Sequence, residues 1–159
     1  MSAIIQGNQL RTLLFGDVVT KTGQALPADA TANLFVVTGG NVLVTSLIGE
    51  VTTVCSSTAT TVSLGLTPSG SGTLEHAGIA QAGAVTSCEV GTFVMPTASG
   101  GTATALAVGT KAGSALFGPP IPFVCPPGDI TWTTSANNGT GVFTWYCTYV
   151  PLDNGAYVS

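Results

Sequence analysis

The chain has 159 residues and a mass of 15.8 kDa, which is the size of one domain. Charged residues make up only 6% of it, hydrophobic residues make up 45%, and the net charge is −4, so intrinsic disorder is excluded. The three cations, Arg11, Lys21 and Lys111, are too few to neutralise a nucleic acid or to hold an anionic membrane surface. No apolar run is long enough for a transmembrane span, and the first residues show no signal peptide.

Residues 1–32 differ in sequence character from the rest of the chain. They are predicted to form an N-terminal arm or edge segment that packs across a neighbouring molecule. Within this segment, residues 10–20 are interpreted as an extended piece and residues 21–29 as a turn-prone stretch. Residues 33–159 are predicted to form one β-sandwich domain, because strand-like segments follow one another through this part of the sequence.

The body of the chain is dominated by Thr, Val, Gly and Ala, and no window shows a helical stripe, so its elements are predicted to be strands. Its first two strands, at 33–38 and 42–48, flank a Gly-Gly-Asn turn at 39–41. The second strand is expected to continue through residue 55, with a bulge or bend at Gly49. Further strands are predicted at 61–66, 78–85, 88–95 and 102–108.

Both faces of the first two strands are apolar. In the first strand, regular alternation places Leu34 and Val36 on one face and Phe35 and Val37 on the other. Because a strand that is apolar on both faces needs cover on both sides, one of the two faces is expected to lie against a partner chain.

The proline-rich segment 118–128 holds five prolines in eleven positions. Proline has no backbone N–H to donate, so this segment is predicted to be an edge strand or a loop across the end of the sandwich.

The C-terminal part is predicted to form a β-hairpin, with strands at 129–135 and 141–150 joined through Asn138 and Gly139. In the second of these strands alternation places four residues on one face, Phe143, Trp145, Cys147 and Tyr149, which Ile130, Trp132 and Thr134 would meet. Eight or so short strands at this spacing predict an all-β fold, an antiparallel β-sandwich or jelly-roll-like barrel with an extended N-terminal arm.

The four cysteines, Cys55, Cys88, Cys125 and Cys147, are 33, 37 and 22 residues apart. Zinc ligands usually come in pairs two to four residues apart with histidines nearby, so no metal is expected. The thiols are interpreted as small buried hydrophobes. One or two disulfides formed after release from a cell are the alternative.

Chemistry-bearing residues are sparse and scattered. The acids occur about one per segment, and Glu75 beside His76 is the single adjacent ionisable pair. A triad built from Ser71 and His76 lacks support, because a triad is defined by geometry and not by closeness in sequence. The Gly-rich stretches lack the lysine and helix of a phosphate loop. We therefore predict no enzyme activity and no cofactor.

The low charge predicts an assembly component. A monomer of this size normally carries a charged, mixed surface, whereas interface centres are depleted of charge. We expect an obligate homo-oligomer, with a homotrimer as the favoured form. Its candidate interface residues are Leu13, Phe15, Pro119, Pro120, Pro122, Trp132 and Tyr146.

Two stretches carry a resemblance: FVVTGG at 35–40 with VLVTSLIGEVTT at 42–53, and the ending with Trp145, YVPL at 149–152 and Gly-Ala at 155–156. Over 33–66 and 129–157 the chain resembles small β-rich virion proteins of tailed bacteriophages, of the capsid decoration or head-fibre type. The resemblance implies a non-enzymatic cement protein that is made in the host cytoplasm, docks on the major capsid protein at the capsid surface and bridges neighbouring coat subunits.

Two alternatives stay open. A tail or fibre component would bind host-surface glycans through exposed aromatic residues such as Trp132 or Tyr146. A cellular carbohydrate-binding or adhesion module would require export, against which the missing signal peptide argues.

Overall fold

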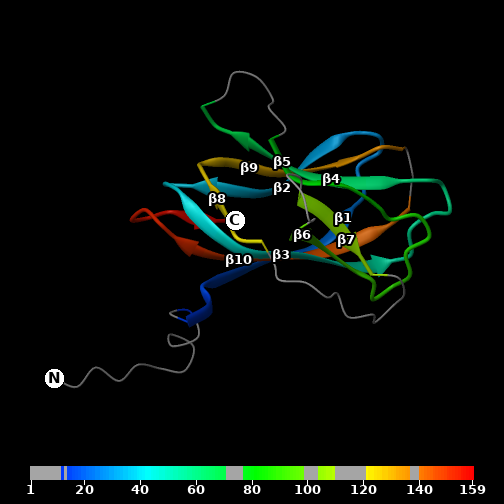
Figure 1. The fold of residues 1–159 in the computed structure, drawn as a ribbon, viewed down its shortest axis with the longest axis horizontal. Helices are drawn as coiled ribbons and strands as arrows, with labels where there is room; N and C mark the ends of the chain where they lie inside the picture. Colours follow the sequence, from blue (N-terminus) through cyan, green and yellow to red (C-terminus); the bar gives the residue numbers. More distant parts are fainter. Residues whose placement is uncertain (1–11, 13, 71–76, 99–103, 110–120, 137–139) are drawn as a thin grey trace.

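The computed structural model describes residues 12, 14–70, 77–98, 104–109, 121–136 and 140–159 (Figure 1). Its elements within these ranges are eleven β-strands. In chain order they are β1 (Asp17–Ala25), β2 (Thr31–Thr38), β3 (Val42–Thr53), β4 (Thr61–Pro68), β5 (Ala77–Ala84), β6 (Phe93–Ala98), β7 (Thr104–Val108), β8 (Phe123–Cys125), β9 (Gly128–Thr134), β10 (Val142–Pro151) and β11 (Tyr157–Val158). None of the described residues forms a helix long and apolar enough to cross a membrane.

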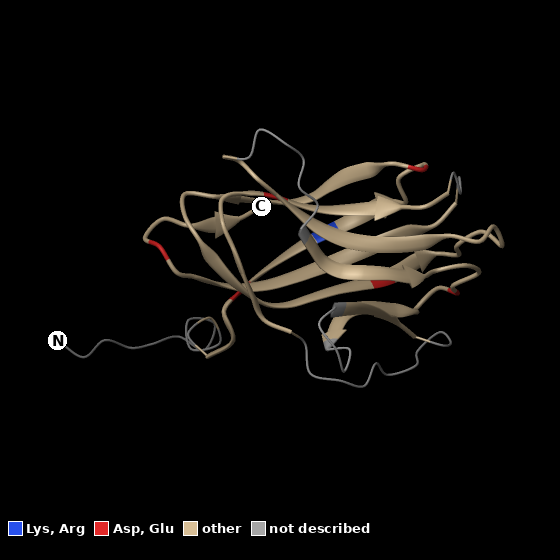
Figure 2. Cartoon of the chain, turned by 45° about the horizontal axis from the view of Figure 1, so that its top comes forward, with Lys and Arg blue, Asp and Glu red and all other residues tan. Residues whose placement is uncertain are grey.

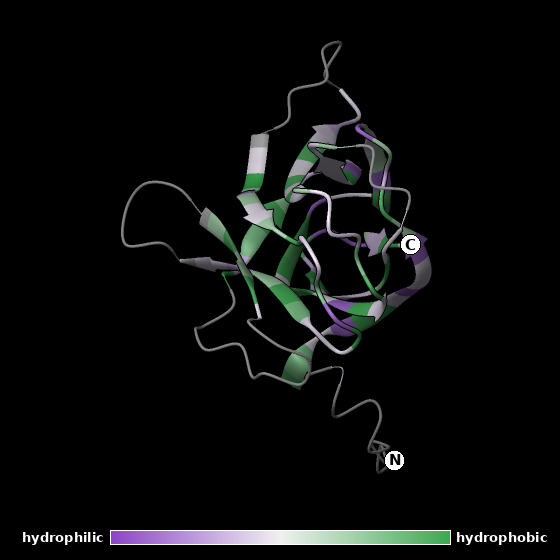
Figure 3. Ribbon diagram, turned by 90° about the vertical axis from the view of Figure 1, so that its right-hand side faces the viewer, coloured by the Kyte–Doolittle hydropathy of each residue, from purple (hydrophilic) through white to green (hydrophobic). Residues whose placement is uncertain are grey.

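The strands form two layers around a common core (Figures 1 and 3). The first layer has the order β1-β10-β3-β6, with β8 also paired to β3, and the second has the order β2-β9-β4-β5, with β11 beside β2. The consecutive pairs β1/β2, β3/β4, β5/β6 and β9/β10 are each split between the two layers. This is the strand order of a jelly roll. The all-β sandwich or jelly-roll prediction is confirmed.

β7 joins the two layers along one side of the sandwich. It pairs antiparallel with β6 and makes a single parallel pairing with β5, Gln81 with Ala105. Along the other side the strand order ends at β1 in one layer and at β11 in the other. The sheet is therefore continuous around one side and ends at two edge strands on the other.

The predicted C-terminal hairpin is wrong, although both of its strands exist. β9 pairs with β2 and β4, whereas β10 pairs with β1 and β3. The two strands face each other across the core, where Trp132 meets Phe143 and Trp145 edge-to-face at ring-centroid distances of 5.8 and 5.7 Å. The aromatic contacts expected between neighbouring strands are thus made between layers. The Asn138–Gly139 turn lies outside the described residues.

The turn at 39–41 also connects two layers, because β2 and β3 are not paired with each other. Gly39 has a φ of +81°, and a side chain there would overlap the carbonyl oxygen of Gly155. The Asp153 carboxylate accepts hydrogen bonds from the backbone N–H (2.7 Å) and the side-chain amide (2.9 Å) of Asn41. The turn is therefore fastened to the residues that follow β10.

A β-bulge in β2 overturns the predicted division of its faces. The pairing with β9 shifts between Asn33 and Phe35, which leaves Leu34 as the extra residue. As a result Leu34 and Phe35 are both buried, at 1% and 0% exposure, and Val36 is exposed. Strict alternation cannot anticipate this, because one inserted residue reverses the direction of every side chain that precedes it.

The bulge predicted at Gly49 is also wrong. The pairing of β3 with β10 shifts at Thr45 and again at Thr52, and it stays regular at Gly49, which lies opposite Trp145. A Cβ atom on Gly49 would lie 2.7 Å from a methyl carbon of Val94 and 3.0 Å from the Trp145 indole. Glycine is needed there because the indole packs directly against the backbone.

The N-terminal segment forms an edge strand on its own chain. β1 pairs with β10, and the predicted turn at 21–29 is reduced to a shift in pairing between Lys21 and Gln24 followed by the connection to β2. Asp17 to Ala25 therefore belong to the sandwich and not to a separate arm. Of the rest of the predicted arm, residues 1–11 and 13 lie outside the described residues.

Two further segments differ in extent from their predictions. β8 is the edge strand expected in the proline-rich segment, and it pairs only with β3 among the described residues. The strand expected from residue 88 starts at Phe93, because turns with bonds from Cys88 N–H to Val85 O (3.3 Å) and from Thr92 N–H to Glu89 O (3.1 Å) precede it.

Candidate functional site

The seven residues predicted as an interface are dispersed. Trp132 is only 2% exposed and packs edge-to-face against Phe143 and Trp145, so its assignment to an interface is wrong. Three of the seven lie outside the described residues: Leu13, Pro119 and Pro120. The three on the surface are Phe15, Pro122 and Tyr146.

A row of apolar side chains crosses the outer face of the first layer. Val150 on β10 pairs with Leu43 on β3, and Leu43 pairs with Val124 on β8. Directly paired residues project from the same face of a sheet, so these three side chains, the apolar row, lie side by side. Val124 is 56% exposed and Val150 38%. At the β1 edge, Val18 is 60% exposed.

Several hydroxyl groups lie on the same face, together with Ile48, which pairs with Tyr146. Thr148, Tyr146 and Thr144 continue along β10, and Thr20 of β1 lies beside Tyr146. The Tyr146 hydroxyl donates a hydrogen bond of 3.1 Å to the carboxylate of Glu50 on β3. Apolar groups can be buried against another protein at low cost, and so can hydroxyl groups whose hydrogen bonds are satisfied.

Charge is nearly absent from the outer face of the first layer. β1, β10, β3 and β8 carry three charged residues, and Figure 2 shows how widely the charges of the described chain are spread. Asp17 and Lys21 pair with the buried Tyr149 and Trp145, so they are on the inward side at the sheet edge. Glu50 alone points outward, because it pairs with Thr144 two residues from Tyr146. An uncharged, partly apolar face has the composition of an interface centre.

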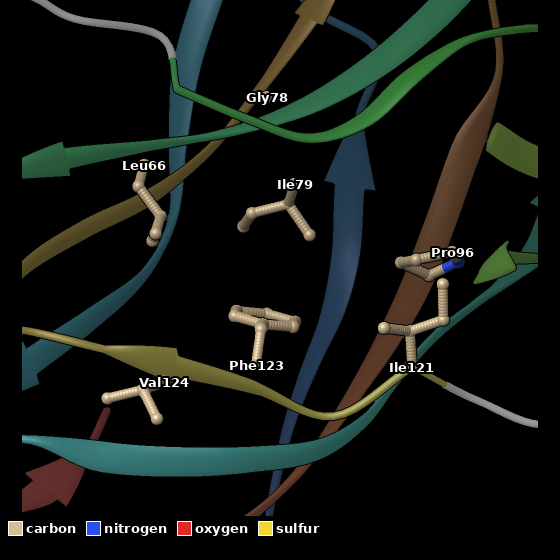
Figure 4. A pocket seen from close by; sticks show the side chains of 7 residues that line it. All are labelled: Leu66, Gly78, Ile79, Pro96, Ile121, Phe123 and Val124. Atoms are coloured by element: carbon tan, nitrogen blue, oxygen red, sulfur yellow. The ribbon is translucent and has the colours of Figure 1, made fainter. Parts of the chain in front are cut away.

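An apolar pocket opens beside the apolar row, where β8 and β6 face β4 and β5 (Figure 4). Its volume is about 200 Å³. The residues that line it are Leu66, Gly78, Ile79, Pro96, Ile121, Phe123 and Val124. Val124 borders the pocket and also belongs to the row, so the two adjoin at β8. With no polar side chain in its lining, the pocket suits an apolar group of a partner and offers nothing to hold a metal or phosphate.

Titratable groups do not gather into a reactive site in the part of the chain that the structure describes. No group of three or more His, Cys, Asp or Glu residues is placed there to hold a metal ion. The four cysteines are free and buried, as their interpretation as small hydrophobes requires. Burial raises the pKa of the Cys125 and Cys147 thiols to about 12. His76 lies outside the described residues.

The apolar row is not predictable from the sequence. Leu43 and Val150 belong to strands that were predicted, and Val124 lies in the proline-rich segment, but nothing local indicates that the three become neighbours. The available signal was the apolar character of both faces of residues 42–48, which predicted a covered outer face without locating it.

Replacing Glu50 by glutamine is expected to lower the pKa of Tyr146. The hydrogen bond to Glu50 and, to a lesser degree, burial and the negative charge of that carboxylate raise the pKa of the phenol above its ordinary value. An amide accepts the bond without the charge, so the tyrosinate forms at lower pH. Ultraviolet titration of the two proteins measures the shift. Identical titration curves would mean that the Tyr146–Glu50 contact does not persist in solution.

Comparisons with protein-family models, with curated proteins and with solved structures find no match to this chain.

Proposed function

We propose that this protein is a non-enzymatic capsid decoration protein that docks on the outer shell of a bacteriophage through the outer face of its first layer. The observation that carries the proposal is the apolar row on an almost uncharged sheet face. Exposed valines on three strands together with a single outward carboxylate are unfavourable in water and favourable against protein. The jelly-roll strand order is one that capsid proteins use, which supports the proposal only by analogy.

The proposed partners are the major capsid protein and further copies of this chain, as a homotrimer. A face that docks on a capsid shell must not repel the coat subunits electrostatically. Because this face has one carboxylate, its charge repulsion is small over a wide range of salt concentrations. The pocket beside the row gives the partner a place for one apolar side chain. Such an anchor, buried near the centre of an interface, contributes much of its binding energy.

The test is binding of purified protein to particles stripped of it, measured by co-sedimentation. Val150→Lys is expected to weaken binding at least about 100-fold, because it places a charge in the apolar row of the docked face. Val36→Lys is the matched control: Val36 is 37% exposed against 38% for Val150, but it belongs to β2 in the second layer. It is expected to bind like the wild type. Equal affinities for both variants would overturn the proposed docking face.

The number of copies in purified virions tests the class of protein. Quantitative mass spectrometry is expected to find this chain in numbers comparable with the coat protein. Fewer than about a dozen copies would move it to the tail.

A tail or fibre component that binds host glycans is the second candidate, and Tyr146 favours it. An aromatic ring with a hydroxyl–carboxylate pair on an open sheet face can stack on a sugar and bond to it. Trp132 cannot serve, because it is buried. Glycan binding that is lost in Tyr146→Ala and kept in Val150→Lys would favour this candidate over decoration.

A further inference from the structure

Two of the four cysteines are joined through their backbones at one end of the sandwich. Cys55 follows the end of β3, and Cys88 lies in the turns between β5 and β6. The N–H of Cys55 donates to the carbonyl oxygen of Cys88 at 3.0 Å. One N–H···O bond of this length keeps the two Cα atoms within about 7 Å of each other, a range that overlaps the span of about 4.4–6.8 Å that a disulfide bridges.

Further hydrogen bonds hold the two segments in this arrangement. The N–H of Ser87 donates to the Ser56 carbonyl at 2.8 Å, and the N–H of Val85 donates to the Thr60 carbonyl at 2.9 Å. The Thr86 hydroxyl accepts from the Thr60 N–H at 3.0 Å. These hydrogen bonds join residues 55–60 to residues 85–88, so backbone pairing holds the two cysteines next to each other.

The surroundings of the two thiols differ in a way that suits stepwise oxidation. Cys88 is 9% exposed and borders a partly polar pocket of about 340 Å³ lined also by Ser87, Glu89 and Thr92. Cys55 is 2% exposed and is not among the residues that line this pocket. Burial, and secondarily the neighbouring Cys88, raise the pKa of Cys55 to about 11, and burial also raises the pKa of Cys88. Both thiols are therefore slow to react at neutral pH.

We propose that Cys55 and Cys88 are a site of reversible oxidation to an intramolecular disulfide by a low-molecular-weight disulfide such as glutathione disulfide. The Cys88 thiolate attacks glutathione disulfide, forming a mixed disulfide and releasing one glutathione thiolate, which takes up the proton that Cys88 lost. The Cys55 thiolate then attacks the Cys88 sulfur, and a second glutathione leaves with the Cys55 proton. Two protein thiols are oxidised, and one glutathione disulfide is reduced to two thiols.

The disulfide would close a loop that contains β4 and β5, two of the four main strands of the second layer. Cross-linking a loop of this length restricts the unfolded chain. The cross-link would therefore raise the unfolding temperature without rearranging the native contacts. A reducing compartment keeps the thiols free, and an oxidising one forms the link.

Cys125 and Cys147 provide the internal control. Both are 0% exposed, and the Cys125 thiol donates to the carbonyl of Pro126 at 3.5 Å. No backbone hydrogen bond among the described residues joins these two cysteines. These two residues carry the same thiol group, but they are less exposed than Cys55 and Cys88, and no such hydrogen bond holds them together.

The experiment incubates the full chain with glutathione disulfide, blocks remaining thiols by alkylation in denaturant, and maps peptic peptides by mass spectrometry. We expect a linked peptide pair containing Cys55 and Cys88, alkylated Cys125 and Cys147, and an unfolding temperature raised by about 5–10 °C. The reaction is expected to accelerate about tenfold for each pH unit between 7 and 9, because the thiolate fraction grows in that proportion. Dithiothreitol should reverse all of these effects.

Cys88→Ser is expected to remove the link and the rise in unfolding temperature, whereas Cys125→Ser should keep both. Should Cys125→Ser fail to fold, the alkylation pattern of the wild type decides alone. A Cys88–glutathione adduct that accumulates without a link to Cys55, alkylation of both cysteines after oxidation, or a link between Cys125 and Cys147 would each overturn the proposal.

Discussion

Trp145→Ala is expected to lower the free energy of unfolding by about 3–5 kcal/mol. The indole is fully buried, packs on Trp132 and Phe143, and lies against the backbone of Gly49. Removing it leaves a cavity between the two layers that glycine at position 49 cannot fill. Urea denaturation followed by far-ultraviolet circular dichroism measures the change, because tryptophan fluorescence would itself be altered by the substitution.

Val150→Ala on the same strand is the control for this experiment. Val150 points to the outer face, so its truncation is expected to cost less than about 1 kcal/mol. Trp145→Phe separates packing from the indole nitrogen. The buried Nε1 of Trp145 has no hydrogen-bond partner among the described residues, so the phenylalanine variant should lose only part of the packing energy. A cost for Trp145→Ala no greater than that for Val150→Ala would contradict the assignment of the faces of β10.

Gly39→Ala is expected to destabilise the protein by about 3–5 kcal/mol, from backbone strain and overpacking together. Gly39 has a φ of +81°, and a Cβ atom there would overlap the backbone of Gly155. The turn between β2 and β3 would have to move away from the residues after β10. That movement would stretch the bonds from Asn41 to Asp153.

The chain offers a matched control for Gly39. Gly155 has a φ of +85°, and a Cβ atom there would meet no described atom within 4 Å. Gly155→Ala therefore carries only the cost of the left-handed conformation, about 1–2 kcal/mol. The difference between the two variants in chemical denaturation isolates the steric term. Equal losses of stability in the two variants would show that the turn adjusts to the added methyl group and does not hold the C-terminal residues in place.

Side-chain direction within a single strand was well predicted from the sequence. Alternation along 141–150 placed Phe143, Trp145, Cys147 and Tyr149 on one face, and all four are buried. Period-two patterning depends only on the local backbone, so it holds until a bulge interrupts it. The bulge at Leu34 is such an interruption, and no special residue announces it.

Strand pairing could not be predicted in the same way. Asn138–Gly139 and Gly39–Gly40 are both typical of tight hairpin turns, but each pair of flanking strands is divided between the layers. Turn residues permit the chain to reverse without specifying the plane of the reversal. The choice between a hairpin and a crossing depends on which faces are buried together, and that is decided by distant strands such as β1 and β3.

The sequence predicts the composition of the candidate docking surface but not its location in the fold. Low charge predicted an extensive interface, and the structure has an almost uncharged outer face. The aromatic and proline residues chosen from the sequence were a poor guide, because Trp132 fills the core. Leu43, Val124 and Val150 come from three segments, and only the register of β3 with β10 and β8 brings them together.

The position of β10 between β1 and β3 determines how this chain can fold. Within the described chain β1 has β10 as its pairing partner, and more than a hundred residues separate the two strands. During synthesis β1 must therefore stay without a partner while eight further strands leave the ribosome. Closing such long loops is slow, and open strand edges invite association with other chains. Productive folding of this protein is thus expected to follow synthesis of β10 and to be helped by chaperones that shield β1 until then.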